Sequence, residues 1–164
     1  MKPLLTILIL LISGLIFSQP KVTTSTTDFA NVQGAWKGTI TYLDYTSGKP
    51  FSMPTNVSLR IANNSQIILS YAYPNEPNAN GKDTLLISSN GLLIDSAEVQ
   101  SREILEDGAV KIVTVKTGRD GNDNKPALIR HSYILGKHSF QNVKEVKFEG
   151  TDKWIVRNTY LFTR

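Results

Sequence analysis

The stretch NVSLRIANNSQIILSYAY, residues 56–73, decides the fold of this chain. Val57, Leu59 and Ile61 alternate with polar residues, which is the pattern of a strand with one buried face. Asn63-Asn64-Ser65 follows, and these residue types favour turns because their side chains bond the local backbone. After the turn, one face of the next segment carries Ile67, Leu69, Tyr71 and Tyr73. The stretch therefore predicts two antiparallel strands joined by a tight turn.

The same character continues outward from this hairpin over residues 34–164. Short alternating segments are separated by Gly-, Asn-, Asp- and Pro-rich turns, and no convincing helical period of 11 or more residues interrupts them. The expected strands are 34–45, 55–61, 66–73, 83–88, 91–95, 97–104, 109–116, 126–135, 140–148 and 153–163.

Sequential strands with short connections favour an antiparallel up-and-down arrangement, and closure into a barrel removes exposed sheet edges. We therefore predict an all-β fold, an up-and-down barrel of 8–10 strands. A two-sheet β-sandwich is the alternative. The pairing across residues 83–105, where the alternation is poorest, stays open.

The N-terminus has the features of an export signal. Lys2 precedes an apolar run from Leu4 to Phe17, which at 14 residues is shorter than the roughly 20 that a membrane-spanning helix needs. We predict a signal peptide over residues 1–18, cut between Ser18 and Gln19, and hence a secreted or periplasmic protein without a transmembrane segment after cleavage. Residues 19–33 are expected to form a flexible leader with a single helical turn near Asp28, and residues 34–164 the barrel domain.

Composition narrows the classes of partner. The chain has no cysteine, so disulfides and thiol chemistry are excluded. Its 18 basic and 14 acidic residues give a net charge of +4 and are spread along the chain. A nucleic-acid-binding protein concentrates its basic residues in one patch with aromatic residues among them, so no nucleic-acid partner is expected. The oligomeric state cannot be derived from this pattern.

Gly34-Ala35-Trp36 opens the first expected strand after the short helical turn. This arrangement resembles the lipocalins and the wider calycin group of β-barrels. In that group, the tryptophan closes one end of the barrel and an arginine from the end of the barrel packs across it. The alternation of the last strand places one face at Trp154, Val156, Asn158, Tyr160, Phe162 and Arg164. The resemblance therefore implies that Arg164 covers Trp36, with Arg157 as the second choice, and that the interior binds a small molecule.

Several inward-facing residues are candidates to line such an interior. His131 shares a face with Ala127, Ile129, Tyr133 and Leu135, so its imidazole is a heme or metal ligand, a donor to a bound molecule, or a satisfied core histidine. Hydroxyl and amide groups fix the polar end of an otherwise apolar ligand. The candidate ligand-binding residues are Tyr42, Tyr71, Tyr73, His131, Tyr133, Asn158 and Tyr160. No catalytic residue, metal site or cofactor is assigned, and the polar residues from Gly118 to Asn124 are predicted to form a turn.

These observations favour an exported lipocalin-like protein that binds a small, largely apolar ligand inside the barrel. One alternative is a non-enzymatic interaction module with a filled core. A less favoured alternative is a small enzyme that uses His131, because the known hydrolase and phosphate-loop motifs are absent from the sequence.

Overall fold

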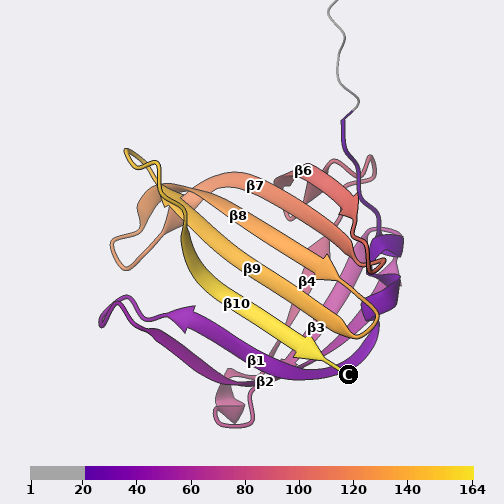
Figure 1. The fold of residues 1–164 in the computed structure, drawn as a ribbon, viewed down its shortest axis with the longest axis horizontal. Helices are drawn as coiled ribbons and strands as arrows, with labels where there is room; N and C mark the ends of the chain where they lie inside the picture. Colours follow the sequence, from indigo (N-terminus) through magenta and orange to yellow (C-terminus); the bar gives the residue numbers. More distant parts are fainter. Residues whose placement is uncertain (1–20) are drawn as a thin grey trace, which may run out of the picture.

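The computed structural model describes residues 21–164, so the expected signal peptide lies outside the described residues. Ten antiparallel strands form one sheet that curls into a nearly closed barrel, which confirms the predicted all-β, up-and-down fold class (Figure 1). The strands are β1 (Gly34–Leu43), β2 (Pro50–Asn63), β3 (Gln66–Ala72), β4 (Gly81–Leu86), β5 (Leu93–Ile94), β6 (Ala97–Ile104), β7 (Val110–Asp120), β8 (Lys125–Leu135), β9 (Ser139–Phe148) and β10 (Ile155–Thr163). Two short 3₁₀ helices are η1 (Thr26–Val32) and η2 (Pro77–Ala79). No helix among residues 21–164 is long and apolar enough to span a membrane.

The sheet order is β4-β3-β2-β1-β10-β9-β8-β7-β6-β5. The first and last strands of the chain, β1 and β10, therefore pair with each other in the middle of the sheet, between β2 and β9. The two free edges, β4 and β5, touch at one end of the barrel. There, Ile87 and Ile94 form a bridge, and the amide of Asp95 donates to the carbonyl of Leu86 over 2.9 Å. The first four residues of β4 are exposed, so the wall is incomplete beyond this contact.

The helix η1 fills the end of the barrel where β4 and β5 meet, and its contacts are with β2 and β8. Phe29 and Val32 are both 0% exposed and belong to the main hydrophobic core, so this part of the expected leader is packed into the barrel. The Phe29 ring meets the edge of Tyr133 at 6.0 Å between centroids. Gly34, with φ of 101°, then turns the chain from η1 into β1, a backbone conformation that favours glycine.

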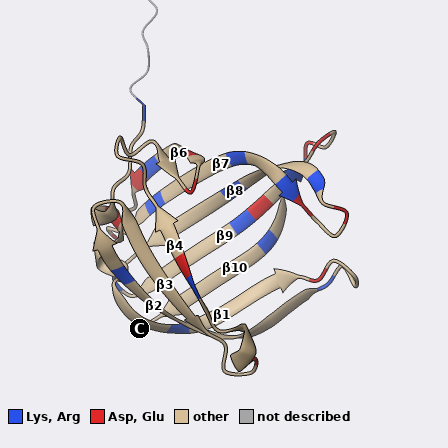
Figure 2. Ribbon diagram, turned by 180° about the vertical axis from the view of Figure 1, so that it is seen from behind, with Lys and Arg blue, Asp and Glu red and all other residues tan. Residues whose placement is uncertain are grey.

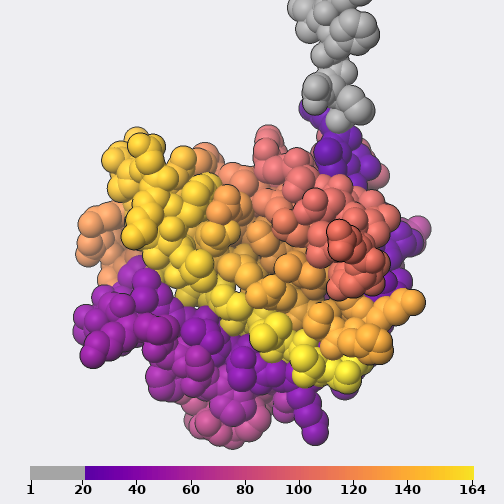
Figure 3. All heavy atoms as spheres, in the orientation of Figure 1, coloured from indigo at the N-terminus to yellow at the C-terminus, as the bar shows by residue number. Residues whose placement is uncertain are grey.

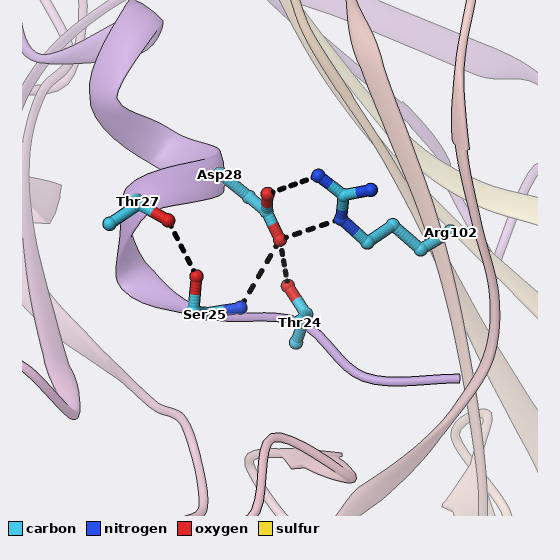
Figure 4. Close-up of polar contacts among 5 residues, drawn as sticks. All are labelled: Thr24, Ser25, Thr27, Asp28 and Arg102. Carbon is cyan, nitrogen blue, oxygen red and sulfur yellow. Dashed lines mark hydrogen bonds and ion pairs between the residues drawn. The ribbon is translucent and has the colours of Figure 1, made fainter. Parts of the chain in front are cut away.

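A partly buried ion pair ties η1 to β6, next to the edge strand β5 (Figure 4). The guanidinium of Arg102, on β6, donates to both carboxylate oxygens of Asp28 over 2.7 and 3.0 Å. The Thr24 hydroxyl and the Ser25 amide donate to the same carboxylate over 2.8 and 3.2 Å. Burial alone would raise the pKa of Asp28, but these hydrogen bonds and the charge of Arg102 together hold that pKa below its ordinary value of 3.8.

The last strand contains a bulge that the simple alternation does not include. Val156 pairs with Glu145 and Asn158 pairs with Lys144, so Arg157 is an extra residue in β10. A bulge of this kind turns its strand, and the face assignment changes on one side of it. Val156 is 51% exposed while Arg157 is only 5% exposed, so the expected inward position of Val156 is wrong.

Trp154 is also misplaced by the simple alternation. Its ring lies on the outer surface, 4.1 Å from the Arg130 guanidinium carbon, and Arg130 forms two hydrogen bonds with Glu145. Figure 3 shows this outer side, where the side chains of β8, β9 and β10 lie next to each other. On the C-terminal side of the bulge the alternation holds, because Phe162, which was expected to face inward, is fully buried.

Two strands are longer than the sequence pattern suggests. β2 begins at Pro50 rather than near residue 55, because its first residues pair with the end of β1 in unbroken register, including Pro54 with Thr39. β7 continues to Asp120 through part of the expected turn, where Asp120 pairs with Lys125 of β8. This extension carries Asp120 to the rim of the barrel.

The Asp28–Arg102 pair predicts a pH-dependent loss of stability. The folded pKa of Asp28 lies below 3.8, so the pair stabilises the fold fully above pH 3.8 and loses this effect as the pH falls through the lowered pKa. Asp28→Asn is expected to lower the free energy of unfolding by about 1–3 kcal/mol near pH 7, and the difference from wild type should shrink below pH 4.

Chemical denaturation monitored by circular dichroism at several pH values measures this effect. Asp123→Asn is the matched control, because Asp123 pairs with Lys125 in an exposed position and should change stability by less than about 1 kcal/mol. Equal effects of the two substitutions at neutral pH would contradict the assigned role of Asp28.

Candidate functional site

The interior of the barrel has three layers along its axis. The main hydrophobic core fills the end beside η1 and includes Trp36, Phe140 and Phe162. A second apolar cluster of Ala127, Ile129 and Val146 lies toward the other end, with Phe148 packed against it. Between these clusters, the inward-facing positions are mainly polar or aromatic: Tyr71, Tyr73, Thr114, His131, Asn142, Lys144, Asn158 and Tyr160. We call these eight residues the polar band.

Seven of the eight polar-band residues are partly exposed although they lie inside the barrel, and Thr114 is buried. On β8, His131 is half-buried while its same-face neighbours Ile129 and Tyr133 are buried. On β9, Asn142 and Lys144 are half-buried between the buried Phe140 and Val146. His131, Asn142 and Lys144 are therefore less buried than the inward-facing residues on either side of them along β8 and β9. Figure 2 shows charged residues on β9 and β10, seen past the edge strand β4.

Three of the expected tyrosines lie together on one wall. The Tyr71 ring is 5.3 Å from that of Tyr160 and 6.4 Å from that of Tyr73. The hydroxyls of Tyr73 and Tyr160 are 3.3 Å apart and share a hydrogen bond. Burial raises the pKa of both Tyr71 and Tyr160, so these hydroxyls are neutral donors and acceptors. Tyr42 is not part of this group and instead packs against Phe51 near the rim.

His131 lies on β8 beside Tyr133, and the two rings stack at 6.0 Å. Its Nδ1 is 3.2 Å from the amide oxygen of Asn142 on β9. Burial lowers the pKa of His131, and the charges of Lys144 and Lys116 lower it further against the opposing hydrogen bond from Asn142. The imidazole is therefore neutral near pH 7. Tyr133 itself is buried and belongs to the main core.

A cluster of charged residues lies at the open side of the polar band. The Lys144 ammonium is 2.5 Å from one oxygen of the Asp120 carboxylate, and the Arg157 Nε is 3.4 Å from the other. The Arg157 guanidinium also lies over the ring of Tyr45, from the β1–β2 loop, at 3.0 Å from its centroid. Asp120 and Arg157 are nearly buried, with side chains 8% and 5% exposed. The bulge in β10 is what turns Arg157 into this position.

Trp36 and Arg164 lie at the end of the barrel beside η1. The Trp36 indole donates to the carbonyl of Val32 over 2.7 Å, and the guanidinium carbon of Arg164 is 4.2 Å from the centre of the indole. Arg164 also donates to the backbone carbonyls of Asn31 and Gln33 over 2.7 and 2.8 Å. The arginine thus joins the C-terminus to η1 across the tryptophan, while Arg157 lies elsewhere.

Sequence reasoning missed the charged half of the interior. Lys144 and Asn142 share the face of Val146 and Phe148, so the alternation of β9 was a sufficient signal for both residues. Arg157 could not be found in this way, because its inward position depends on the bulge. The role of Asp120 was hidden by the polar composition of residues 118–124, which is typical of a turn.

Two further features of the described residues concern metal binding and the hollow at the rim of the barrel. Within residues 21–164, no three His, Cys, Asp or Glu side chains gather in a way that could hold a metal ion. A hollow of about 560 Å³ lies at the rim between Tyr45, Asp120 and Phe148, outside the polar band.

Comparisons with known proteins support the fold and stop there. No protein-family model matches the chain, and no curated protein matches it. The crystal structure of Rv2717c from M. tuberculosis is similar, with a TM-score of 0.56 and 10% sequence identity. The match covers 85% of this chain and 96% of that chain. At this identity, the similarity shows a shared barrel architecture, which is consistent with a calycin-like barrel.

The charges around His131 predict a shift that can be measured by NMR. Because Lys144 lowers the pKa of His131, Lys144→Gln should move the titration of the imidazole upward, toward its ordinary value of 6.5. Lys147→Gln is the matched control, since Lys147 lies on the outer face near Trp154. Imidazole chemical shifts recorded against pH give the result. A shift caused by the Lys147 substitution and not by the Lys144 substitution would contradict the assigned faces of β9.

Proposed function

We propose that this barrel binds a small, largely apolar molecule with one polar end, held at the level of the polar band. The observation that carries the proposal is the half-buried state of inward-facing side chains between two apolar clusters. Ligand sites in proteins are concave and mostly apolar, with a few polar groups that fix orientation. The interior of this chain has that composition.

The aromatic wall indicates the shape of the ligand. Tyr71, Tyr73 and Tyr160 present rings at centroid distances of 5.3 to 6.4 Å, and the stacked pair of His131 and Tyr133 belongs to β8. Aromatic side chains pack favourably against a planar aromatic group in offset-stacked or edge-to-face arrangements. The neutral hydroxyls and the imidazole then supply hydrogen bonds to a polar substituent.

The two other hypotheses receive less support. An interaction module with a filled core does not require solvent-accessible side chains in the middle of the barrel, as found at His131 and Asn142. A small enzyme based on His131 needs an ionisable partner within hydrogen-bond reach, and the partner of His131 is the amide of Asn142. We also propose that the protein is exported, and this proposal rests on the apolar run from Leu4 to Phe17.

Equilibrium dialysis with 2-naphthamide, a neutral planar probe, tests the function. The proposal predicts saturable binding with a dissociation constant of about 10–100 µM, as expected for a probe of this size in a preformed site. Asn158→Trp should abolish binding, because Asn158 faces inward in the polar band and an indole would occupy the proposed site.

Thr159→Trp is the matched control, since Thr159 is the adjacent residue on the opposite face of β10. It should leave binding unchanged, and thermal unfolding would confirm that both variants are folded. Absence of saturable binding to the wild-type protein, or equal loss in the two variants, would contradict the proposal.

A further inference from the structure

Two cationic side chains face the interior at the open side of the polar band. Lys144 on β9 lies beside His131 on β8 in register, and Arg157 is turned inward by the bulge of β10. The Lys144 side chain is 28% exposed. Placing such groups inside a barrel is costly unless their charges are compensated.

The described residues supply less negative charge than these cations need. Asp120 is the carboxylate within ion-pair distance of both, with one oxygen near Lys144 and the other near Arg157. Lys116 faces the same interior and bonds to a backbone carbonyl, that of Asp95, over 3.2 Å. Burial raises the pKa of Asp95, and the charge of Lys116 lowers it. Lys144 and Arg157 therefore share one carboxylate within ion-pair distance, that of Asp120.

A single atom of Arg157 shows this shortage of partners. Its side chain is 5% exposed, and its Nε is buried without a hydrogen-bond partner among residues 21–164. The 3.4 Å separation from Asp120 is an ion-pair distance and does not satisfy this donor. Buried donors are almost always paired in folded proteins, so this unpaired guanidinium nitrogen is exceptional.

We propose that Lys144 and Arg157 form an anion subsite, and that the ligand of this barrel carries a carboxylate. This inference rests on the proposed function, because it assigns the polar end of the same ligand. The aromatic body of the ligand lies against Tyr71 and Tyr160, and its carboxylate lies beside Lys144 and Arg157. Asp120 then acts as the internal counter-ion that holds the two cations in place in the free protein.

The test compares 2-naphthoate with 2-naphthamide, which has nearly the same shape and no charge, by equilibrium dialysis on the same protein. The proposal predicts that naphthoate binds about tenfold more tightly, since charge-assisted hydrogen bonds are stronger than neutral ones. Lys144→Gln should remove this preference, so that naphthoate and naphthamide bind the variant with equal affinity. Lys147→Gln removes the same charge from the outer face of β9 and should preserve the preference.

Asp120→Asn gives a second, independent readout. Removing the internal counter-ion should increase the preference for naphthoate over naphthamide, measured on the same variant. Equal binding of the two probes to the wild-type protein would overturn the anion subsite and leave the proposed function standing. A preference for naphthoate that persists in Lys144→Gln would have the same consequence. Failure of both probes to bind would overturn the proposed function, and the subsite with it.

Discussion

The Asp28–Arg102 ion pair is the contact on which the rest of the barrel depends. Asp28 belongs to η1 and Arg102 to β6, which are 74 residues apart in the chain. Their pair holds η1 against the end of the sheet, where Phe29 and Val32 complete the core. Because β5 consists of two residues, the backbone pairing near this edge is short, and side-chain contacts must supplement it. One end of the barrel is therefore sealed, and any hollow must open elsewhere.

The barrel is thus closed at the end beside η1 and has an incomplete wall between β4 and β5, and we call this shape the cup. The apolar residues beside η1 form its base, and the polar band forms its wall. Thr55, 0% exposed, contributes a hydroxyl without a hydrogen-bond partner among the described residues, and Arg157 contributes an unpaired nitrogen. A buried polar group without a hydrogen-bond partner lowers the stability of the fold. Proteins retain such local conflicts mainly at functional sites, and Arg157 is joined to Lys144 of the polar band by their shared partner Asp120.

The sequence was informative where one rule decided the position of a residue. Alternation alone placed Leu59, Leu69 and Tyr133 on the inner face, because an uninterrupted strand has a period of two. It was wrong at Val156, since a bulge depends on the fit of β10 to β9 and leaves no reliable local pattern. The packing of Phe29 into the core was not apparent because η1 is surrounded by Thr and Ser. The charged cluster required contacts between β7, β9 and β10, which no single segment contains.

A crystal structure of the protein with 2-naphthoate tests most directly whether the cup is a binding site. If the ligand binds inside the barrel, the naphthalene ring lies beside Tyr71 and Tyr160, and its carboxylate lies within hydrogen-bond distance of Lys144 or Arg157. Density for the probe at the outer surface alone, with the interior unchanged and filled by side chains, would contradict it.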